Sequence, residues 1–238
     1  MSLGALALRV VSETRVLREL VENRLGWATS TEYQREGLLL SRPAEGGSVG
    51  KPSWVLYESG SIVLRRTPQE SDAVNAACFH LVALEAATTS PHLALRLRTI
   101  LLPGGDAVLA DAQALHDLAG HDRRLGARGC LVLPTTVALV DPDAMELILP
   151  DQDVDQAVPT GRRAISQVVI RQRDPSPLAE ADPLLALAAA ALRDPELDLQ
   201  ATLQQIARLA EADAGVVRLA PVDDIIALPD ELGLRRSS

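Results

Sequence analysis

An α/β fold, with helices and strands mixed along one chain, is predicted by two features of the sequence. Continuous or alternating apolar runs, typical of strands, take turns with segments whose apolar residues recur every three or four positions, typical of helices. Hydrophobic residues make up 47% of the 238 positions, which is enough to bury the core of one large domain. Because no internal repeat or abrupt change in composition divides the chain, we expect a single domain over residues 1–238.

The first 92 residues are expected to form an N-terminal subregion that contains a strand, a helix and a β-hairpin. Ser12 offers an N-cap for the first helix, and the Gly-, Pro- and Ser-rich stretch Ser41–Pro52 indicates a loop. Two β-prone runs flank Glu58-Ser59-Gly60, which predicts the hairpin. The expected elements are strand Leu3–Val11, helix Arg15–Leu25, hairpin strands Trp54–Tyr57 and Ser61–Arg65, and helix Ser71–Ala87.

Residues 93–238 are expected to form the main core, in which strands again alternate with helices. The expected strands are Leu95–Leu102, Ala107–Ala110, Cys130–Leu133, Val137–Val140, Met145–Leu149, Gln167–Arg171 and Val216–Leu219. The expected helices are Asp111–Leu125, Pro183–Leu192 and Leu199–Ala212, with a terminal helical turn after Asp223–Leu228.

Charge and residue usage exclude several classes of function. The formal net charge is −9, which disfavours binding to nucleic acid or to an anionic membrane. The only lysine is Lys51, so chemistry that needs a lysine elsewhere, such as a Schiff base, is excluded. No apolar stretch reaches the length of a membrane span, and no N-terminal signal is visible. Cys78 and Cys130 form no CxxC motif, so we expect two buried thiols in a reducing cytoplasm.

Aromatic and arginine side chains indicate where a partner could bind. All five aromatic residues lie at or before Phe79, and aromatics and arginines are the residues that most often anchor interfaces. We therefore expect peptide-binding residues in the N-terminal subregion and in one basic cluster. These candidates are Trp27, Tyr33, Trp54, Tyr57, Arg162 and Arg163. Two alternatives stay open, namely that the aromatics pack in the core and that the arginines form salt bridges with nearby Asp and Glu.

The segment Leu95–Pro150 carries a recognisable order of motifs. A strand leads to the turn Gly104-Gly105-Asp106, the strand Ala107–Ala110 follows, and Val137–Asp143 later reads VALVDPD. This order resembles the nucleotide-binding proteins related to HPr kinase and phosphoenolpyruvate carboxykinase, and the resemblance covers most of the chain. It implies an HPr-kinase/PEP-carboxykinase-like core over residues 93–238, with a phosphate loop expected directly after Ala110.

The phosphate loop itself is missing from this sequence. Such a loop needs glycines, a lysine and a Ser or Thr to hold the phosphates and Mg²⁺. The matching segment 111–117 has none of these residue types, and its carboxylates would repel phosphate. The positions that mark this degenerate site are Asp111, Gln113, His116 and Asp117.

Two further features of the family have changed. Thr135 and Thr136 stand where the resemblance places an acidic metal-binding pair, and neutral hydroxyls are poor Mg²⁺ ligands. The strand before the loop carries Arg96 and Arg98 near the position of the family's histidine. We expect no cofactor and no metal site, and we assign no catalytic residue. His116 and His121 are five positions apart, so they would lie about 140° apart around a helix.

These observations predict a non-catalytic, pseudokinase-like accessory protein that binds a peptide or protein in the cytoplasm. The resemblance implies a specific partner, a ribosomally made precursor peptide in a modified-peptide biosynthetic pathway. Two alternatives stay open: an atypical kinase or phosphatase that acts on a peptide through a rebuilt nucleotide site, and a structural subunit of an oligomer. A homo-oligomer is compatible with each of the three.

Overall fold

The computed structural model describes the parts of the chain that build two β-sheets and three helices. The described residues are 9–12, 37–41, 54–58, 62–111, 125–150, 158–171, 182–192, 199–211, 216–220, 223–224 and 227–228. The expected helices Arg15–Leu25 and, apart from its two ends, Asp111–Leu125 lie outside these residues, as does most of the loop Ser41–Pro52.

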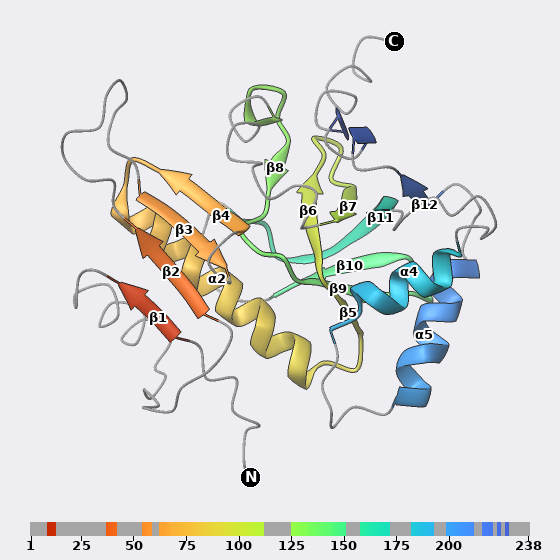
Figure 1. Cartoon of the computed structure of the whole chain (residues 1–238). Helices are drawn as coiled ribbons and strands as arrows, with labels where there is room; N and C mark the ends of the chain where they lie inside the picture. The colour runs from red at the N-terminus through yellow and green to blue at the C-terminus, as the bar shows by residue number, and fades with distance from the viewer. Residues whose placement is uncertain are drawn as a thin grey trace.

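A four-stranded sheet forms the N-terminal part of the fold (Figure 1). Its strands follow one another in chain order, with β1 parallel to β2 and the remaining neighbours antiparallel. They are β1 (Arg9–Ser12), β2 (Gly37–Ser41), β3 (Trp54–Glu58) and β4 (Ile62–Thr67). The hairpin of β3 and β4 confirms the sequence prediction, whereas β2 was not expected from the sequence.

Helix α2 (Glu70–Thr89) lies between the two sheets and is buried on more than one face. Residues 76–84 are all buried, so the helix has no exposed stripe along its middle turns. One side, which includes Ala77 and Leu81, packs with Leu56 and Leu64 of the four-stranded sheet. Another side packs on β9 of the second sheet. A helix that is apolar all round is typical of a core position, and this explains why the segment is rich in alanine.

The second sheet has eight strands and contains most of the core. Its order is β5-β9-β10-β11-β7-β6-β8, and β12 pairs with β11. The long strand β11 (Gly161–Arg171) holds the sheet together, because its first residues pair with β10 and its later residues pair with β7 and β12. The other strands are β5 (Leu93–Leu95), β6 (Leu97–Leu101), β7 (Ala107–Asp111), β8 (Leu131–Val132), β9 (Ala138–Asp141), β10 (Glu146–Leu149) and β12 (Val217–Ala220).

Two C-terminal helices pack against each other and against this sheet. They are α4 (Pro183–Ala190) and α5 (Leu199–Glu211). Asp182 caps α4, because its carboxylate accepts a hydrogen bond from the backbone N–H of Leu184. Leu187, Ile206 and Leu209 are buried in the main core. Both helices confirm the sequence prediction.

The mixed α/β class is confirmed, but two strand predictions were wrong. The predicted strand Leu95–Leu102 is two strands, β5 and β6, because the chain changes partner at Arg96 from β9 to β7. Strand β11 begins six residues before the predicted Gln167, since residues 161–164 pair with β10 despite their polar sequence. The free cysteines Cys78 and Cys130 are both buried, as expected. Among the described residues, no helix is both long enough and apolar enough to cross a membrane.

The hairpin turn between β9 and β10 predicts a specific sensitivity to mutation. Met145 has a φ of 54°, in the left-handed region that β-branched residues strongly avoid, while Asn tolerates it. We expect Met145→Val to be less stable than Met145→Asn by about 1 kcal/mol in urea denaturation, although Val retains more apolar surface. Equal stability of the two variants would show that the turn relaxes without cost.

Candidate functional site

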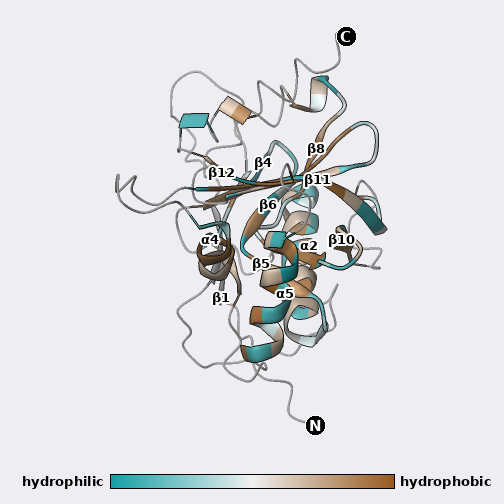
Figure 2. Cartoon of the chain, turned by 90° about the vertical axis from the view of Figure 1, so that its right-hand side faces the viewer, coloured by the Kyte–Doolittle hydropathy of each residue, from teal (hydrophilic) through white to brown (hydrophobic). Residues whose placement is uncertain are grey.

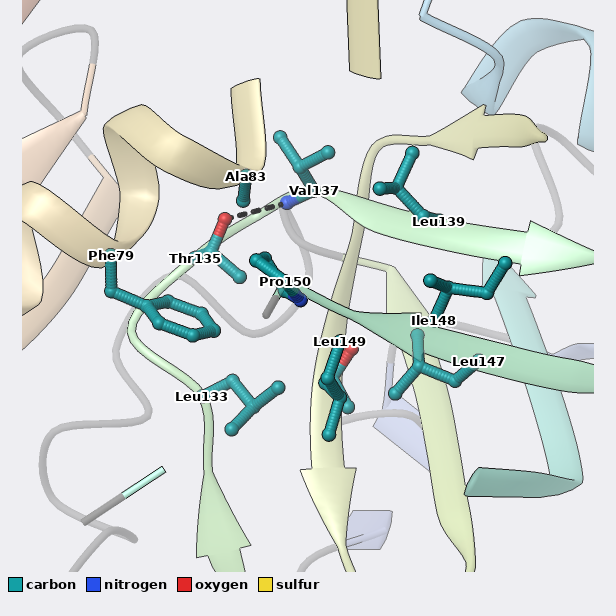
Figure 3. Close-up of a pocket in the computed structure, with 11 residues that line it drawn as sticks. Phe79, Ala83, Leu133, Thr135, Val137, Leu139, Leu147, Ile148, Leu149 and Pro150 are labelled. Carbon is teal, nitrogen blue, oxygen red and sulfur yellow. Dashed lines mark hydrogen bonds between the residues drawn. The ribbon is translucent and has the colours of Figure 1, made fainter. Parts of the chain in front are cut away.

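Thr135 and Thr136 follow strand β8 and lie inside the protein. Their exposed fractions are 1% and 0%. The hydroxyl oxygen of Thr135 accepts a hydrogen bond from the backbone N–H of Val137 at 3.1 Å and lies 3.0 Å from Nδ1 of His80 (Figure 3 shows the bond to Val137). The hydroxyl of Thr136 donates to Oε2 of Glu58. Both hydroxyls are therefore bonded to groups in the core.

Glu58 is a buried carboxylate at the end of β3. It is 5% exposed, and its Oε1 accepts a hydrogen bond from Nη2 of Arg96 at 2.9 Å. Burial by itself raises the pKa of Glu58, but His80 when it is protonated in acid, the hydroxyl of Thr136 and the guanidinium of Arg96 together hold it below its ordinary value. Glu58 is therefore ionised at neutral pH.

His80, from the middle of α2, joins the carboxylate to the first hydroxyl. Its Nε2 lies 3.8 Å from Oε1 of Glu58, and the side chain is fully buried. The carboxylate favours the tautomer with the proton on Nε2, so Nδ1 accepts the hydroxyl proton of Thr135. Burial, together with Arg96 and Arg98, lowers the pKa of His80 to about 4 although Glu58 acts in the opposite direction. The imidazole is therefore neutral at pH 7.

These side chains form one group, which we call the Glu58 cluster: Glu58, His80, Arg96, Thr135 and Thr136. Its members come from β3, from α2, from the residue between β5 and β6, and from the segment between β8 and β9. The cluster thus links the four-stranded sheet, the helix and the eight-stranded sheet through groups that are largely shielded from water.

Arg98, on β6, makes a second connection between the sheets. Its guanidinium donates hydrogen bonds to the carbonyls of Val63 and Leu64 on β4, and the residue is only 1% exposed. The register of β3 and β4 shifts beside Leu64, which leaves this residue without a Cα partner in the ladder. Arg98 therefore supplies hydrogen-bond donors to backbone carbonyls of β4 at the point where the register of this strand is irregular.

A hydroxyl, an imidazole and a carboxylate in this order can also activate a nucleophile. Such a role for Thr135 requires that a substrate can reach its hydroxyl. The cavity beside Thr135 lies between Phe79 and Ala83 of α2 and the strands β9 and β10 (Figure 3). The volume open to the centre of a water molecule is about 10 Å³, which is room for about one water. Within the described residues, the hydroxyl of Thr135 is therefore enclosed by core side chains, and its hydrogen bonds join α2 to the segment before β9.

The structure brings together only part of the predicted site. Of the degenerate nucleotide site, Thr135 and Thr136 belong to the Glu58 cluster, and Asp111 is half-buried at the end of β7. Gln113, His116 and Asp117 lie outside the described residues, as do Trp27 and Tyr33. The sequence analysis placed Glu58 only in a hairpin turn and noted Arg96 only as standing near the family's histidine, so it assigned neither residue to a site. No local signal could have found them, because Glu58 is 38 positions from Arg96 and 78 from Thr136.

The predicted peptide-binding residues that the structure describes lie in two different sheets. Trp54 and Tyr57 are half-buried on β3, whereas on β11 Arg162 is exposed and Arg163 is half-buried. Arg162 forms ion pairs with Asp141 and Glu146, each at 3.0 Å, which is the salt-bridge alternative left open by the sequence. The side chain of Arg163 donates to the carbonyl of Arg162.

No family model matches the chain, and no curated protein and no solved structure matches it either. In the described part of the chain, His, Cys, Asp and Glu side chains nowhere gather in threes in a geometry that could hold a metal ion.

The buried imidazole predicts a loss of stability in mild acid. His80 titrates near 6.5 when unfolded and near 4 when folded, so between these values the unfolded chain binds more protons and stability falls as the pH falls. At about 1.4 kcal/mol per pH unit, we expect a loss of about 3 kcal/mol between pH 7 and pH 4. Glu58, whose pKa is lowered, adds a further loss only below its unfolded value of 4.5.

Urea denaturation as a function of pH tests this expectation. His80→Gln, which cannot titrate, should flatten the dependence between pH 6.5 and pH 4, whereas the matched variant His92→Gln should keep the wild-type slope. A His80→Gln protein with the same acid sensitivity as the wild type would assign the effect to other groups.

Proposed function

We propose that this chain is a non-catalytic, kinase-like protein of the cytoplasm that binds a peptide or protein partner. The observation that carries the proposal is the inward bonding of Thr135 and Thr136. These residues stand where the HPr-kinase-like family has its acidic pair, and both hydroxyls serve His80 and Glu58 instead of facing a ligand.

Because the hydroxyls of Thr135 and Thr136 are bonded to core groups, the metal-binding part of a phosphoryl-transfer site is missing at this point. Mg²⁺ requires oxygen ligands, preferably carboxylates, in a near-octahedral arrangement. At this strand end the side chains of Thr135 and Thr136 are neutral, buried and already bonded, and the carboxylate that contacts them among the described residues, Glu58, is bound by Arg96 and Thr136. The sequence of residues 111–117 lacks the phosphate-binding part, because it offers no glycine, lysine or hydroxyl for the phosphates.

A scaffold without this machinery still offers surfaces for an extended peptide. Among the described strands, β4 pairs only with β3, and it carries the exposed Arg66 and the half-exposed Arg65. Because Arg98 already occupies the carbonyls of Val63 and Leu64, a peptide can add as a further strand only beside the later residues of β4, where guanidinium groups favour acidic side chains. Arg163, half-buried on β11, is a further group for a carboxylate. These features support an acidic, extended partner, and a ribosomally made precursor peptide is the specific one we propose.

Two measurements on the full chain test the proposal. In a thermal-shift assay, about 5 mM Mg-ATP should change the Tm by less than about 1 °C, because a ligand that binds only the folded state must raise it. In isothermal titration, the precursor peptide encoded beside the gene should give saturable heat without nucleotide. Arg66→Ala should weaken that binding about five- to tenfold, and Arg208→Ala, which removes an exposed arginine elsewhere, should not.

The opposite results would favour the enzyme alternative. Stabilisation by Mg-ATP, or a gain of about 80 Da on a candidate peptide after incubation with Mg-ATP, would contradict a non-catalytic role. Absence of heat with the precursor peptide would remove that specific partner.

A further inference from the structure

One buried hydroxyl in the main core has no hydrogen-bond partner among the described residues. It belongs to Thr99 in the middle of β6, and this residue is 0% exposed. A hydroxyl that leaves water without gaining a hydrogen bond destabilises the fold, and nearly all such groups in proteins are bonded to the protein or to ordered water. We therefore expect Thr99 to have a partner that is not a side chain or backbone group of the described residues.

The side chain of Thr99 faces the helices that cover the eight-stranded sheet. Alternate residues of a strand face opposite sides of a sheet, so Thr99 shares its side with Leu97 and Leu101. Both leucines pack in one apolar cluster with residues of α2, α4 and α5, whereas Ile100 belongs to a different cluster. Figure 2 shows these three helices on the same side of β11 and β12. The hydroxyl therefore lies in the interior between the sheet and the helices.

The cavity beside Thr135 also borders Thr99. Its lining includes Thr99 and Leu133 together with residues of α2, β9 and β10. The backbone N–H of Leu133 donates to the carbonyl of Thr99 at 2.9 Å, which holds the segment that leads to Thr135 beside β6. The volume of about 10 Å³ that is open to the centre of a water molecule is enough for about one water. The unpartnered hydroxyl and a space of the size of a water therefore lie side by side.

Thr135 offers a second polar atom on the wall of this cavity. Its hydroxyl donates to Nδ1 of His80 at 3.0 Å and accepts from the backbone N–H of Val137 at 3.1 Å. A hydroxyl oxygen has two lone pairs, so Thr135 can accept one more hydrogen bond. Among the described residues that line the cavity, Thr99 and Thr135 are the two with polar side chains. Two polar partners are the smallest number that normally holds a buried water.

We propose that this cavity is the binding site of one structural water, which accepts a hydrogen bond from the hydroxyl of Thr99 and donates one to the hydroxyl oxygen of Thr135. The water supplies the partner that Thr99 lacks among the described residues. It also extends the Glu58 cluster by one step, from Thr135 to the middle of β6. Cavities with purely apolar walls stay dry, and the two hydroxyls are what distinguishes this cavity from them.

The sign of the stability change in Thr99→Val tests the proposal on the full chain. The substitution replaces the hydroxyl by a methyl group of similar size. If Thr99 binds the water, the variant takes away one of its partners, and the unfolding equilibrium constant from urea denaturation should rise about three- to tenfold. If the cavity is dry, the variant removes an unsatisfied buried hydroxyl, and the same constant should fall. A constant that falls or stays the same would overturn the proposal.

A crystal structure of the full chain at about 1.5 Å resolution tests the site directly. Electron density in the wild type should show one water within about 2.6–3.2 Å of both hydroxyl oxygens, and Thr99→Val should lose it. An empty cavity in the wild type, a water that contacts only one of the hydroxyls, or a Thr99 hydroxyl bonded to a protein group would each contradict the proposed site.

Discussion

Glu58 carries a carboxylate into the contact between the two sheets, where water cannot satisfy it. A charge in such a place is tolerated only when protein groups replace its hydration. Here Arg96 and Thr136 donate hydrogen bonds to it, and the imidazole of His80 lies 3.8 Å away; each of the three comes from a different segment of the chain. Because the four-stranded sheet supplies the acceptor and the other segments supply the donors, the N-terminal strands, α2 and the main sheet are held in one arrangement.

The buried carboxylate of Glu58 also explains why positions 135 and 136, after strand β8, carry hydroxyl groups and no carboxylates. If carboxylates stood at Thr135 and Thr136, they would face Glu58 at close range in a shielded environment, and the repulsion would be severe. Hydroxyls are the groups that can donate there, to Nδ1 of His80 and to Oε2 of Glu58. In this protein Thr135 and Thr136 therefore help to hold the two sheets together. This role is compatible with a scaffold that binds a partner without transferring a phosphoryl group.

Local patterns predicted the helices α2, α4 and α5 and the β3–β4 hairpin, since these depend on periodicity within a few residues. Pairing between distant segments decided the rest. Residues 161–164 form a strand because β10 lies beside them. The predicted strand is interrupted at Arg96 because β5, before it, pairs with β9, whereas β6, after it, pairs with β7. The Glu58 cluster joins residues up to 78 positions apart, and no spacing rule relates them. Thr135 and Thr136 were found through a resemblance, but their bonding partners were not.

A double-mutant cycle between Glu58 and Thr136 tests most directly whether the buried carboxylate and its donor act as a unit. Glu58→Met and Thr136→Val each remove one member and leave the other buried and partly unsatisfied, so each should cost about 2–3 kcal/mol in urea denaturation. The double variant removes both, and its loss should be smaller than the two single losses combined by about 1.5–3 kcal/mol. A coupling energy near zero would show that the two sheets do not depend on this bond and would contradict the account.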